Sequence, residues 1–328
     1  MMPFIEGESL RERMSREDWS PKKVLVSDPL HEGLGARLAE ARPDLTIHER
    51  GVADVTDADV AWADVFVGFR PPRTGAWSEL PWVHCIGAGV DAWAFRTGLS
   101  PRTLLTRTSE DFGPQMGEYC LSRALAVTQR LRHLESEQRA RSWKPKHPEQ
   151  IRGSVALVVG TGTVGAGIAR ALLGAGCIVN GLSRSGRPRD PFGRVFPVEA
   201  FGDAVAGVRW LVLACPLTEE TWHLLDRDRL AACGGAYLIN VGRGALVDEA
   251  VLPEALDNSW LSGAALDVFE REPLPESSPL WAREEVTISP HISGLTTVPG
   301  AAAGFLEVLA DLEAGREPRL RVELERGY

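Results

Sequence analysis

The chain has 328 residues, of which 44% are hydrophobic, so it is long and apolar enough for two folded domains and is neither disordered nor fibrous. Its 45 acidic residues outnumber its 36 lysines and arginines, and the net charge of −9 repels phosphate backbones and acidic membrane surfaces. Nucleic acid and membranes are therefore not expected as partners, and no apolar run approaches the ~20 residues that span a bilayer.

Residues 1–20 mix Glu, Asp and Arg and contain no apolar run of the kind that a secretory signal needs. We expect a polar N-terminal extension on a cytoplasmic protein. The cysteines show no CxxC spacing and fall mostly inside apolar runs, which predicts free thiols and neither a disulfide framework nor a metal site. These cysteines are Cys85, Cys120, Cys177, Cys215 and Cys233.

The first part of the chain has the pattern of a small α/β unit. Residues 22–28 predict a strand and 34–41 a helix, and residues 63–69 and 82–89 predict further strands that end in glycine-bearing loops. A long helical stretch follows from Gly113 to Trp143, with apolar residues at helical spacing. A helix of this length would carry the chain into a second domain.

The second domain begins after a proline-marked linker, with the wholly apolar run VALVV that is typical of a buried parallel strand. Strands are expected at 155–159, 177–182, 210–214, 236–241, 263–268 and 285–289, and a last helix near 300–314. Alternation of short apolar runs with helical segments predicts an α/β fold with parallel sheets. We place the second domain at 114–293 and a first, discontinuous domain at 21–113 plus 294–328.

A glycine motif follows VALVV directly and leads into the helical sequence AGIARALLGAG. In GTGTVG, Gly160 permits a tight turn, Gly162 lets a pyrophosphate approach the backbone, and Gly165 lets helix and strand pack closely. Thr163 and Val164 lie at the start of the helix, where free N–H groups bind phosphate. The order strand, turn and helix predicts a dinucleotide site, and the alternative is a purely structural glycine turn.

About 20 residues further on, an acidic residue would normally bind the ribose hydroxyls of NAD. This chain has Ser183, Arg184 and Ser185 instead, and a guanidinium with two hydroxyls suits a 2′-phosphate. NADP is therefore the favoured cofactor, with NAD as a second choice. The alternative is that Arg184 is a solvated loop charge.

Three polar residues of the second domain lie just after apolar runs: Arg243, Glu272 and His291. The carboxyl ends of parallel strands open onto the ligand crevice, so these side chains are candidates to converge there. Taken singly, each has a simpler interpretation as a surface charge, a turn carboxylate or a loop histidine.

The surrounding motifs favour a catalytic role for these three residues over the simpler interpretations. GTGTVG, LACPLTEETWHLL, GAYLINVGRGALVDEAVL, GAALDVFEREPLPESSPLW and VTISPHISG resemble, in order and spacing, the D-isomer-specific 2-hydroxyacid dehydrogenases. IGAGVD at 86–91 and the terminal ERGY fit the same pattern, and the resemblance extends from about Val24 to Tyr328. Within the family, GAGVD, SRS, REPLP with SPLW and the RGY ending are most similar to glyoxylate/hydroxypyruvate reductases that use NADPH.

The resemblance implies two Rossmann-like domains, one flavodoxin-like and one doubly wound, with the active site in the cleft between them. It implies that Arg243 holds the substrate carboxylate and carbonyl oxygen, that His291 is the general acid/base and that Glu272 is its carboxylate partner. Backbone amides of Ala88 and Gly89 would receive the substrate carboxylate. Further residues would line the cofactor: Pro216, Thr221, Val241, Gly242 and, near the nicotinamide ring, Asp267.

ARSWKP at 140–145 is similar to a segment of the hydroxypyruvate reductases in which a tryptophan reaches the partner subunit's active site. Trp143 is therefore a candidate substrate-site residue of a homodimer, or else it packs in its own linker. The chemistry agrees with the family assignment, because hydride addition to a 2-oxo acid needs a proton donor beside the carbonyl oxygen and imidazole suits that task.

Two other readings remain open. A dinucleotide-binding redox sensor or corepressor-like protein has no need of an acid/base pair, so Arg243, Glu272 and His291 disfavour it. Another dehydrogenase of the same fold is the second alternative. Formate dehydrogenases carry glutamine in place of the glutamate, and regulated phosphoglycerate dehydrogenases often have an extra C-terminal domain.

Overall fold

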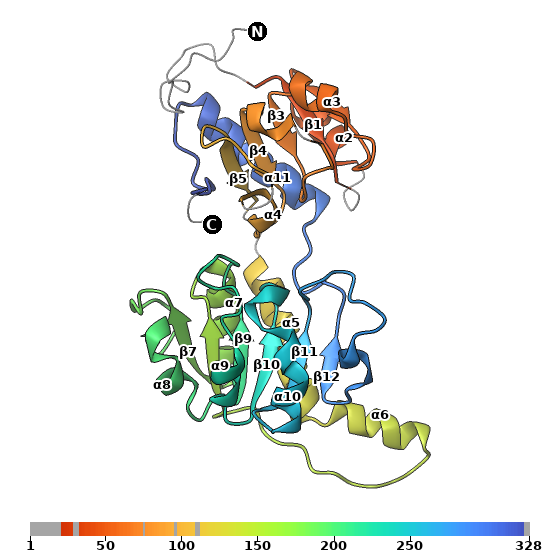
Figure 1. Ribbon diagram of the computed structural model, residues 1–328, viewed down its shortest axis with the longest axis vertical. Helices are drawn as coiled ribbons and strands as arrows, with labels where there is room; N and C mark the ends of the chain where they lie inside the picture. The colour runs from red at the N-terminus through yellow and green to blue at the C-terminus, as the bar shows by residue number, and fades with distance from the viewer. Residues whose placement is uncertain (1–20, 29–32, 75, 95–96, 109–111, 325–328) are drawn as a thin grey trace. The chain divides into compact units, whose positions relative to one another are not determined.

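The computed structural model describes residues 21–28, 33–74, 76–94, 97–108 and 112–324 (Figure 1). The chain divides into two compact units, Met1–Glu110 with Thr296–Tyr328, and Asp111–Leu295. These divisions fall two or three residues from the domain boundaries expected at 113/114 and 293/294. The expected extension at 1–20 and the terminal ERGY motif lie outside the described residues.

The first unit is built on a five-stranded sheet whose paired strands are all parallel, with the order β2-β1-β3-β4-β5. Its strands are β1 (Lys23–Val26), β2 (Thr46–Glu49), β3 (Val65–Val67), β4 (Trp82–Cys85) and β5 (Leu104–Arg107). Its helices are α2 (Leu34–Ala41), α3 (Asp57–Trp62), α4 (Asp91–Ala94) and α11 (Val298–Glu313), with a 3₁₀ turn at Ala76–Glu79. The order 2-1-3-4-5 is that of flavodoxin-like folds.

Both faces of this sheet are covered, because successive strand residues point to opposite sides. Val24 and Val26 pack in a cluster with the buried sides of α2 and α11, whereas Leu25 packs with Trp77 and Trp93. The three buried residues of β1, Val24 to Val26, are therefore all apolar, since neither face of the strand meets water there.

The second unit contains a seven-stranded parallel sheet with the order β12-β11-β10-β9-β6-β7-β8. Its strands are β6 (Val155–Val159), β7 (Ile178–Ser183), β8 (Val195–Pro197), β9 (Trp210–Leu213), β10 (Ala236–Asn240), β11 (Leu261–Leu266) and β12 (Val286–Ile288). Numbered within the unit, this is the doubly wound order 3-2-1-4-5-6 with one further strand, so the expected fold class is confirmed.

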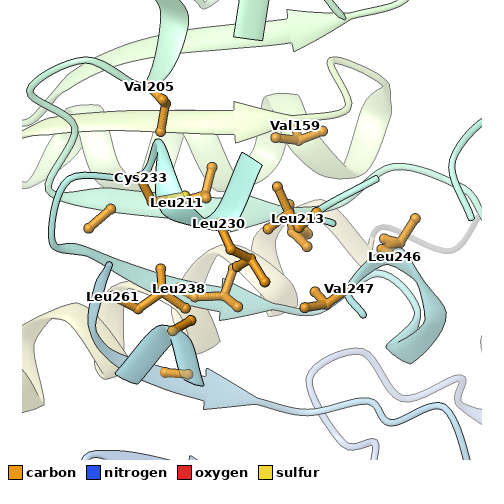
Figure 2. Packing of buried hydrophobic residues seen from close by; sticks show 14 of the residues in the cluster. Val159, Val205, Leu211, Leu213, Leu230, Cys233, Leu238, Leu246, Val247 and Leu261 are labelled. Atoms are coloured by element: carbon orange, nitrogen blue, oxygen red, sulfur yellow. The ribbon is translucent and has the colours of Figure 1, made fainter. Parts of the chain in front are cut away.

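The second unit has six α-helices among the described residues, and all but α6 pack near its sheet. They are α5 (Phe112–Thr128), α6 (Leu131–Arg139), α7 (Thr163–Gly174), α8 (Phe201–Val205), α9 (Arg227–Ala231) and α10 (Leu252–Asp257). Short 3₁₀ turns lie at Val198–Ala200, Gly244–Leu246, Glu249–Val251 and Pro279–Ala282. On one face, Leu211, Leu213 and Leu238 pack with residues such as Leu230 and Val247 (Figure 2). The buried strands hold the loops at their carboxyl ends in place.

The single helix expected from Gly113 to Trp143 is wrong in detail, because the structure has two helices there. Arg130 adopts a left-handed conformation with φ of 58°, which ends α5 and starts α6 in a new direction. Glu149 of the linker stabilises the break, since its N–H donates to the carbonyl of Thr128 at 2.8 Å and its carboxylate pairs with Arg130. Helical spacing in the sequence continues through this break and does not reveal it.

Within the part of the chain that the structure describes, none of the helices has the length and hydrophobicity of a transmembrane span. All five cysteines are free thiols, and burial raises the pKa of Cys215 and Cys233 to about 12. Both thiols are therefore neutral at physiological pH.

Candidate active site

The glycine loop between β6 and α7 has the geometry that a bound pyrophosphate requires. Gly160 has φ of 100°, and a Cβ at Gly165 would lie 1.8 Å from the carbonyl oxygen of Gly160, so a side chain at 165 would separate helix and strand. A Cβ at Gly162 would meet no atom of the described residues within 4 Å. No side chain caps α7, whose first turn starts with Thr163 and Val164, so its N–H groups are available to phosphate.

The segment expected to select the cofactor follows at the end of β7. The Ser183 hydroxyl accepts the N–H of Gly186 at 3.2 Å, and that of Ser185 accepts the N–H of Arg187 at 3.4 Å. These hydroxyls keep their own hydrogens for a phosphate oxygen. Arg184 has a 58% exposed side chain, and its guanidinium lies 4.0 Å from the carboxylate of Glu220. Glu220 was not foreseen from the sequence.

The other residues expected to line the cofactor lie at the carboxyl ends of β9 and β10. The Thr221 hydroxyl donates to the carbonyl of Pro216 at 2.8 Å, which closes the loop after β9. Val241 is buried, and the N–H of Gly242 donates to the side chain of Asn240 at 3.1 Å. Both loops are thus held by their own hydrogen bonds.

His291 and Glu272 form a hydrogen-bonded pair. Nδ1 of His291 lies 2.9 Å from Oε2 of Glu272, and both side chains are partly exposed. Oε1 of the same carboxylate accepts the N–H of Phe269 at 3.2 Å, which fixes the direction of the glutamate. The hydrogen bond to Glu272 places a hydrogen on Nδ1, so Nε2 is the imidazole atom left to exchange a proton with a ligand.

Arg243 follows β10, the strand beside β11, and β11 in turn pairs with β12. The three candidate catalytic residues therefore come after three neighbouring parallel strands. The Arg243 guanidinium donates to the carbonyl of Gly242 at 2.8 Å. A Cβ at Gly244 would lie 1.8 Å from the carbonyl carbon of Phe269, so the loop of Arg243 touches, backbone to backbone, the loop that leads to Glu272.

Asp267 holds the loop that carries His291. Its side chain is fully buried, and its carboxylate accepts the Ser289 hydroxyl at 2.6 Å and the N–H groups of Ile292 and Ser293 at 3.0 and 2.8 Å. The Asp267 carbonyl accepts the N–H of His291 at 2.8 Å. These bonds stabilise His291 at its unfavourable φ of 54°.

This role was missed in the sequence, where Asp267 was expected near the nicotinamide ring. Two of the three partners of its carboxylate are backbone N–H groups, which carry no residue-type signal. Ser289 also accepts the Tyr119 hydroxyl at 2.6 Å, and burial raises the pKa of this tyrosine. The hydrogen-bond chain therefore extends from the loop into α5.

His223, Asp248 and Glu270 form a second cluster at the ends of strands in this unit, with possible metal-ligand atoms within 4.8 Å of one another. Nε2 of His223 already lies 3.0 Å from Oε1 of Glu270. Nδ1 of His223 lies 3.9 Å from Oδ2 of Asp248, so the cluster joins the loops after β9, β10 and β11.

The first unit contains Ala88 and Gly89, in the loop that follows β4. The carbonyl of Ala88 accepts a hydrogen bond from Arg107 at 2.9 Å, and the carbonyl of Ile86 accepts one from the Thr296 hydroxyl at 2.8 Å. Trp143 belongs to the second unit and is 99% exposed, so it does not pack in its own linker.

Residues 121–293 match the family model described as the NAD-binding domain of D-isomer-specific 2-hydroxyacid dehydrogenases. The chain is 35% identical over 276 residues to glyoxylate/hydroxypyruvate reductase A of Serratia proteamaculans (strain 568), a match that covers 81% of this chain and 88% of that protein.

Two solved structures are similar along almost the whole chain. A D-isomer-specific 2-hydroxyacid dehydrogenase of Xanthobacter autotrophicus Py2, in complex with NADPH and MES, has a TM-score of 0.84 at 33% identity and covers 94% of this chain and 100% of its own. An NADPH-dependent glyoxylate/hydroxypyruvate reductase of Sinorhizobium meliloti, in complex with NADP and sulfate, has a TM-score of 0.82 at 25% identity with the same coverage.

Proposed function

The chain belongs to the D-isomer-specific 2-hydroxyacid dehydrogenase family, and from this premise we propose that it reduces small 2-oxo acids of the glyoxylate and hydroxypyruvate type with NADPH. It is an NAD(P)-dependent oxidoreductase. The observation that carries the proposal is the 2.9 Å contact of His291 with Glu272, beside the loop of Arg243. A sensor without turnover has no use for such an acid/base pair.

When bound, the reduced nicotinamide supplies the hydride that adds to the substrate carbonyl carbon. The proton that the carbonyl oxygen then needs comes from Nε2 of His291, because Nδ1 is directed at Glu272. Glu272 stabilises the imidazolium before it donates. The product is the 2-hydroxy acid, as the D isomer where that carbon is chiral, and the reverse reaction uses His291 as the base.

The substrate carboxylate is the group that positions the carbonyl. We assign it to the forked guanidinium of Arg243 and to the backbone amides of Ala88 and Gly89. A guanidinium can share its donors between the carboxylate and the carbonyl oxygen, on which negative charge develops during hydride transfer. Arg243 thus serves both binding and catalysis.

The preference for NADPH is supported by the end of β7. Ser183, Arg184 and Ser185 offer a guanidinium and two hydroxyls to a 2′-phosphate, and no acidic residue occupies this turn. The glycine loop and the uncapped N-terminus of α7 fit the pyrophosphate. The relatives from Xanthobacter and Sinorhizobium carry NADPH and NADP.

We also propose a homodimer that works in the cytosol, where its five thiols stay reduced. Helix α6 buries none of its residues, and it extends with the following segment away from the sheet of the second unit (Figure 1). Leu131, Leu134 and Trp143 are 45%, 47% and 99% exposed there. A second copy of the chain would cover this apolar surface and bring Trp143 to the partner's substrate.

The proposal is tested with a substrate panel. Glyoxylate, hydroxypyruvate, pyruvate, 3-phosphohydroxypyruvate and longer 2-oxo acids are offered with NADPH and NADH in parallel, and we expect the highest kcat/KM for glyoxylate or hydroxypyruvate with NADPH. A preference for the phosphorylated acid would favour a phosphoglycerate dehydrogenase, and dinucleotide binding without turnover would favour a sensor. Sedimentation of wild type and Leu134→Glu tests the dimer, since the added charge should leave monomers.

A further inference from the structure

Side chains of other segments donate hydrogen bonds to the carbonyl groups of the loop after β4 and hold it in place. The Thr296 hydroxyl donates to Ile86, the Arg107 guanidinium donates to Ala88, and the Cys85 thiol contacts the carbonyl of Gly89 at 3.6 Å. Arg107 is the last residue of β5 and pairs in register with Cys85, the last residue of β4. The guanidinium therefore lies directly beside the start of this loop.

The contact with Ala88 fixes the direction of a neighbouring donor. The peptide bond between Ala88 and Gly89 is trans, so its C=O and its N–H point in opposite directions. Because the carbonyl points toward Arg107, the N–H of Gly89 points away from it. A cation on the carbonyl also polarises the peptide group, which makes the N–H on the other side a stronger donor.

Arg107 is positively charged and partly buried, and no carboxylate of the described residues neutralises it. None of the described residues forms an ion pair with it, and its guanidinium bonds only to the Ala88 carbonyl. Burial lowers the pKa of Arg107, but an arginine remains protonated at physiological pH. A partly buried cation is screened less by water than an exposed one, so a ligand that supplies a negative charge nearby is attracted to it.

We propose that Arg107 is a positioning residue for anionic substrates: it orients the peptide between Ala88 and Gly89 so that the N–H of Gly89 faces the substrate carboxylate, and its charge attracts that carboxylate. The inference rests on the proposed function, in that this loop is the one that binds the carboxylate. It adds a residue that does not touch the substrate but acts on it through the peptide bond between Ala88 and Gly89.

The test uses the full-length enzyme with two substitutions, Arg107→Met and Arg107→Lys. Arg42→Met is the matched control, because Arg42 also belongs to the first unit and pairs with Asp44 and Glu313 at the opposite, amino-terminal edge of the sheet. The measured quantities are the KM of glyoxylate, the inhibition constant of oxalate, kcat and the KM of NADPH. Urea unfolding of each variant shows whether it is folded.

For Arg107→Met we expect KM and the inhibition constant to rise about tenfold, which is ~1.4 kcal/mol of binding, while kcat and the KM of NADPH change less than about twofold. Arg107→Lys should recover part of the loss, because it keeps the charge but not the planar guanidinium that donates to the Ala88 carbonyl. Arg42→Met should match wild type. Unchanged carboxylate constants in Arg107→Met, or an equal loss in kcat and NADPH binding, would overturn the inference.

Two complications are covered by the same set of proteins. If Arg107→Met does not fold, Arg107→Lys decides, since wild-type constants for both glyoxylate and oxalate in that variant would show that the guanidinium contact with the Ala88 carbonyl does not position the loop. If wild type reduces none of the 2-oxo acids, the proposed function fails, and calorimetric titration with oxalate still tests Arg107. Weaker oxalate binding in the variants supports the inference, and equal binding overturns it.

Discussion

Oε2 of Glu272 lies 2.9 Å from Nδ1 of His291, so Nε2 is the imidazole nitrogen to which we assign the proton transfer. His291→Ala should lower the rate of 2-oxo acid reduction by roughly 10²-fold or more, the usual scale of general acid/base catalysis. The dissociation constant of NADPH, measured by fluorescence titration, should change little because the glycine loop is intact. A mutant with full turnover would remove His291 from the mechanism.

Arg243→Ala should raise the KM of glyoxylate and lower kcat together. The guanidinium is assigned to the bound carboxylate and also to the oxygen on which charge develops, so both ground state and transition state lose a partner. Arg243→Lys should rescue little, since an ammonium lacks the fork. Steady-state kinetics in both variants check this, and a defect confined to NADPH affinity would place Arg243 at the cofactor instead.

The guanidinium of Arg184 lies 4.0 Å from the carboxylate of Glu220, so we expect substitutions of these two residues to change NADPH binding in opposite directions. Arg184→Ala should lower kcat/KM for NADPH about tenfold and leave NADH almost unchanged, because screening at this exposed site keeps a charged hydrogen bond near the low end of its ~1.5–3 kcal/mol. Glu220→Gln should strengthen NADPH binding, since a carboxylate that competes with the 2′-phosphate is gone. Both effects should shrink as salt is raised.

The control for this pair is Arg316→Ala, which removes an exposed arginine that pairs with Asp311 in the other unit. Its ratio of NADPH to NADH efficiency should equal that of wild type. A wild-type preference for NADH, or a ratio that Arg184→Ala does not move, would make Arg184 a surface charge only.

Burial of His84 should lower the free energy of unfolding of the protein in acid. It is fully buried, its ring nitrogens contact the hydroxyls of Thr106 and Thr108, and burial lowers its pKa from 6.5 to about 3. Unfolding exposes an imidazole that takes up a proton below about pH 6.5, whereas the folded one stays neutral until about pH 3. This contribution is complete above pH 6.5 and falls by up to ~1.4 kcal/mol per pH unit below it.

Urea unfolding of wild type and His84→Gln, at about pH 7.5 and about pH 5.5, isolates this contribution because glutamine does not titrate. We expect wild type to lose more unfolding free energy than the variant between the two pH values. Equal losses in the two proteins would show that His84 is protonated in the folded state.

The sequence predicted strands best where the strand itself is buried and its residues are apolar. Strands of the second unit such as β6 and β9 were recognised because they are continuously apolar, whereas β8, with only three residues, was not. The places of Arg243, Glu272 and His291 after strands made them candidates, and the family resemblance supplied their roles. By contrast, β2 is short and partly exposed, with the mixed sequence TIHE, and was not recognised. The apolar start of β5 was missed as well, and with it Arg107 at its end.

The sequence could not reveal the contacts that backbone groups make. Asp267 has the same residue type whether it binds a ligand or holds the loop of His291, and only the folded loop brings the N–H groups of Ile292 and Ser293 to it. The break at Arg130 is similar, because it is stabilised by Glu149 of the linker, 19 residues further along the chain.

The close approach of Gly244 to the backbone of Phe269 limits how this enzyme can be altered by directed evolution. Any side chain at position 244 would force apart the two loops that lead to Arg243 and Glu272, so variants there lose the reaction before they gain a new substrate. Ile292 is 46% exposed beside His291 and has no such restriction. Libraries that vary position 292 and keep glycine at 244 should therefore contain far more active members.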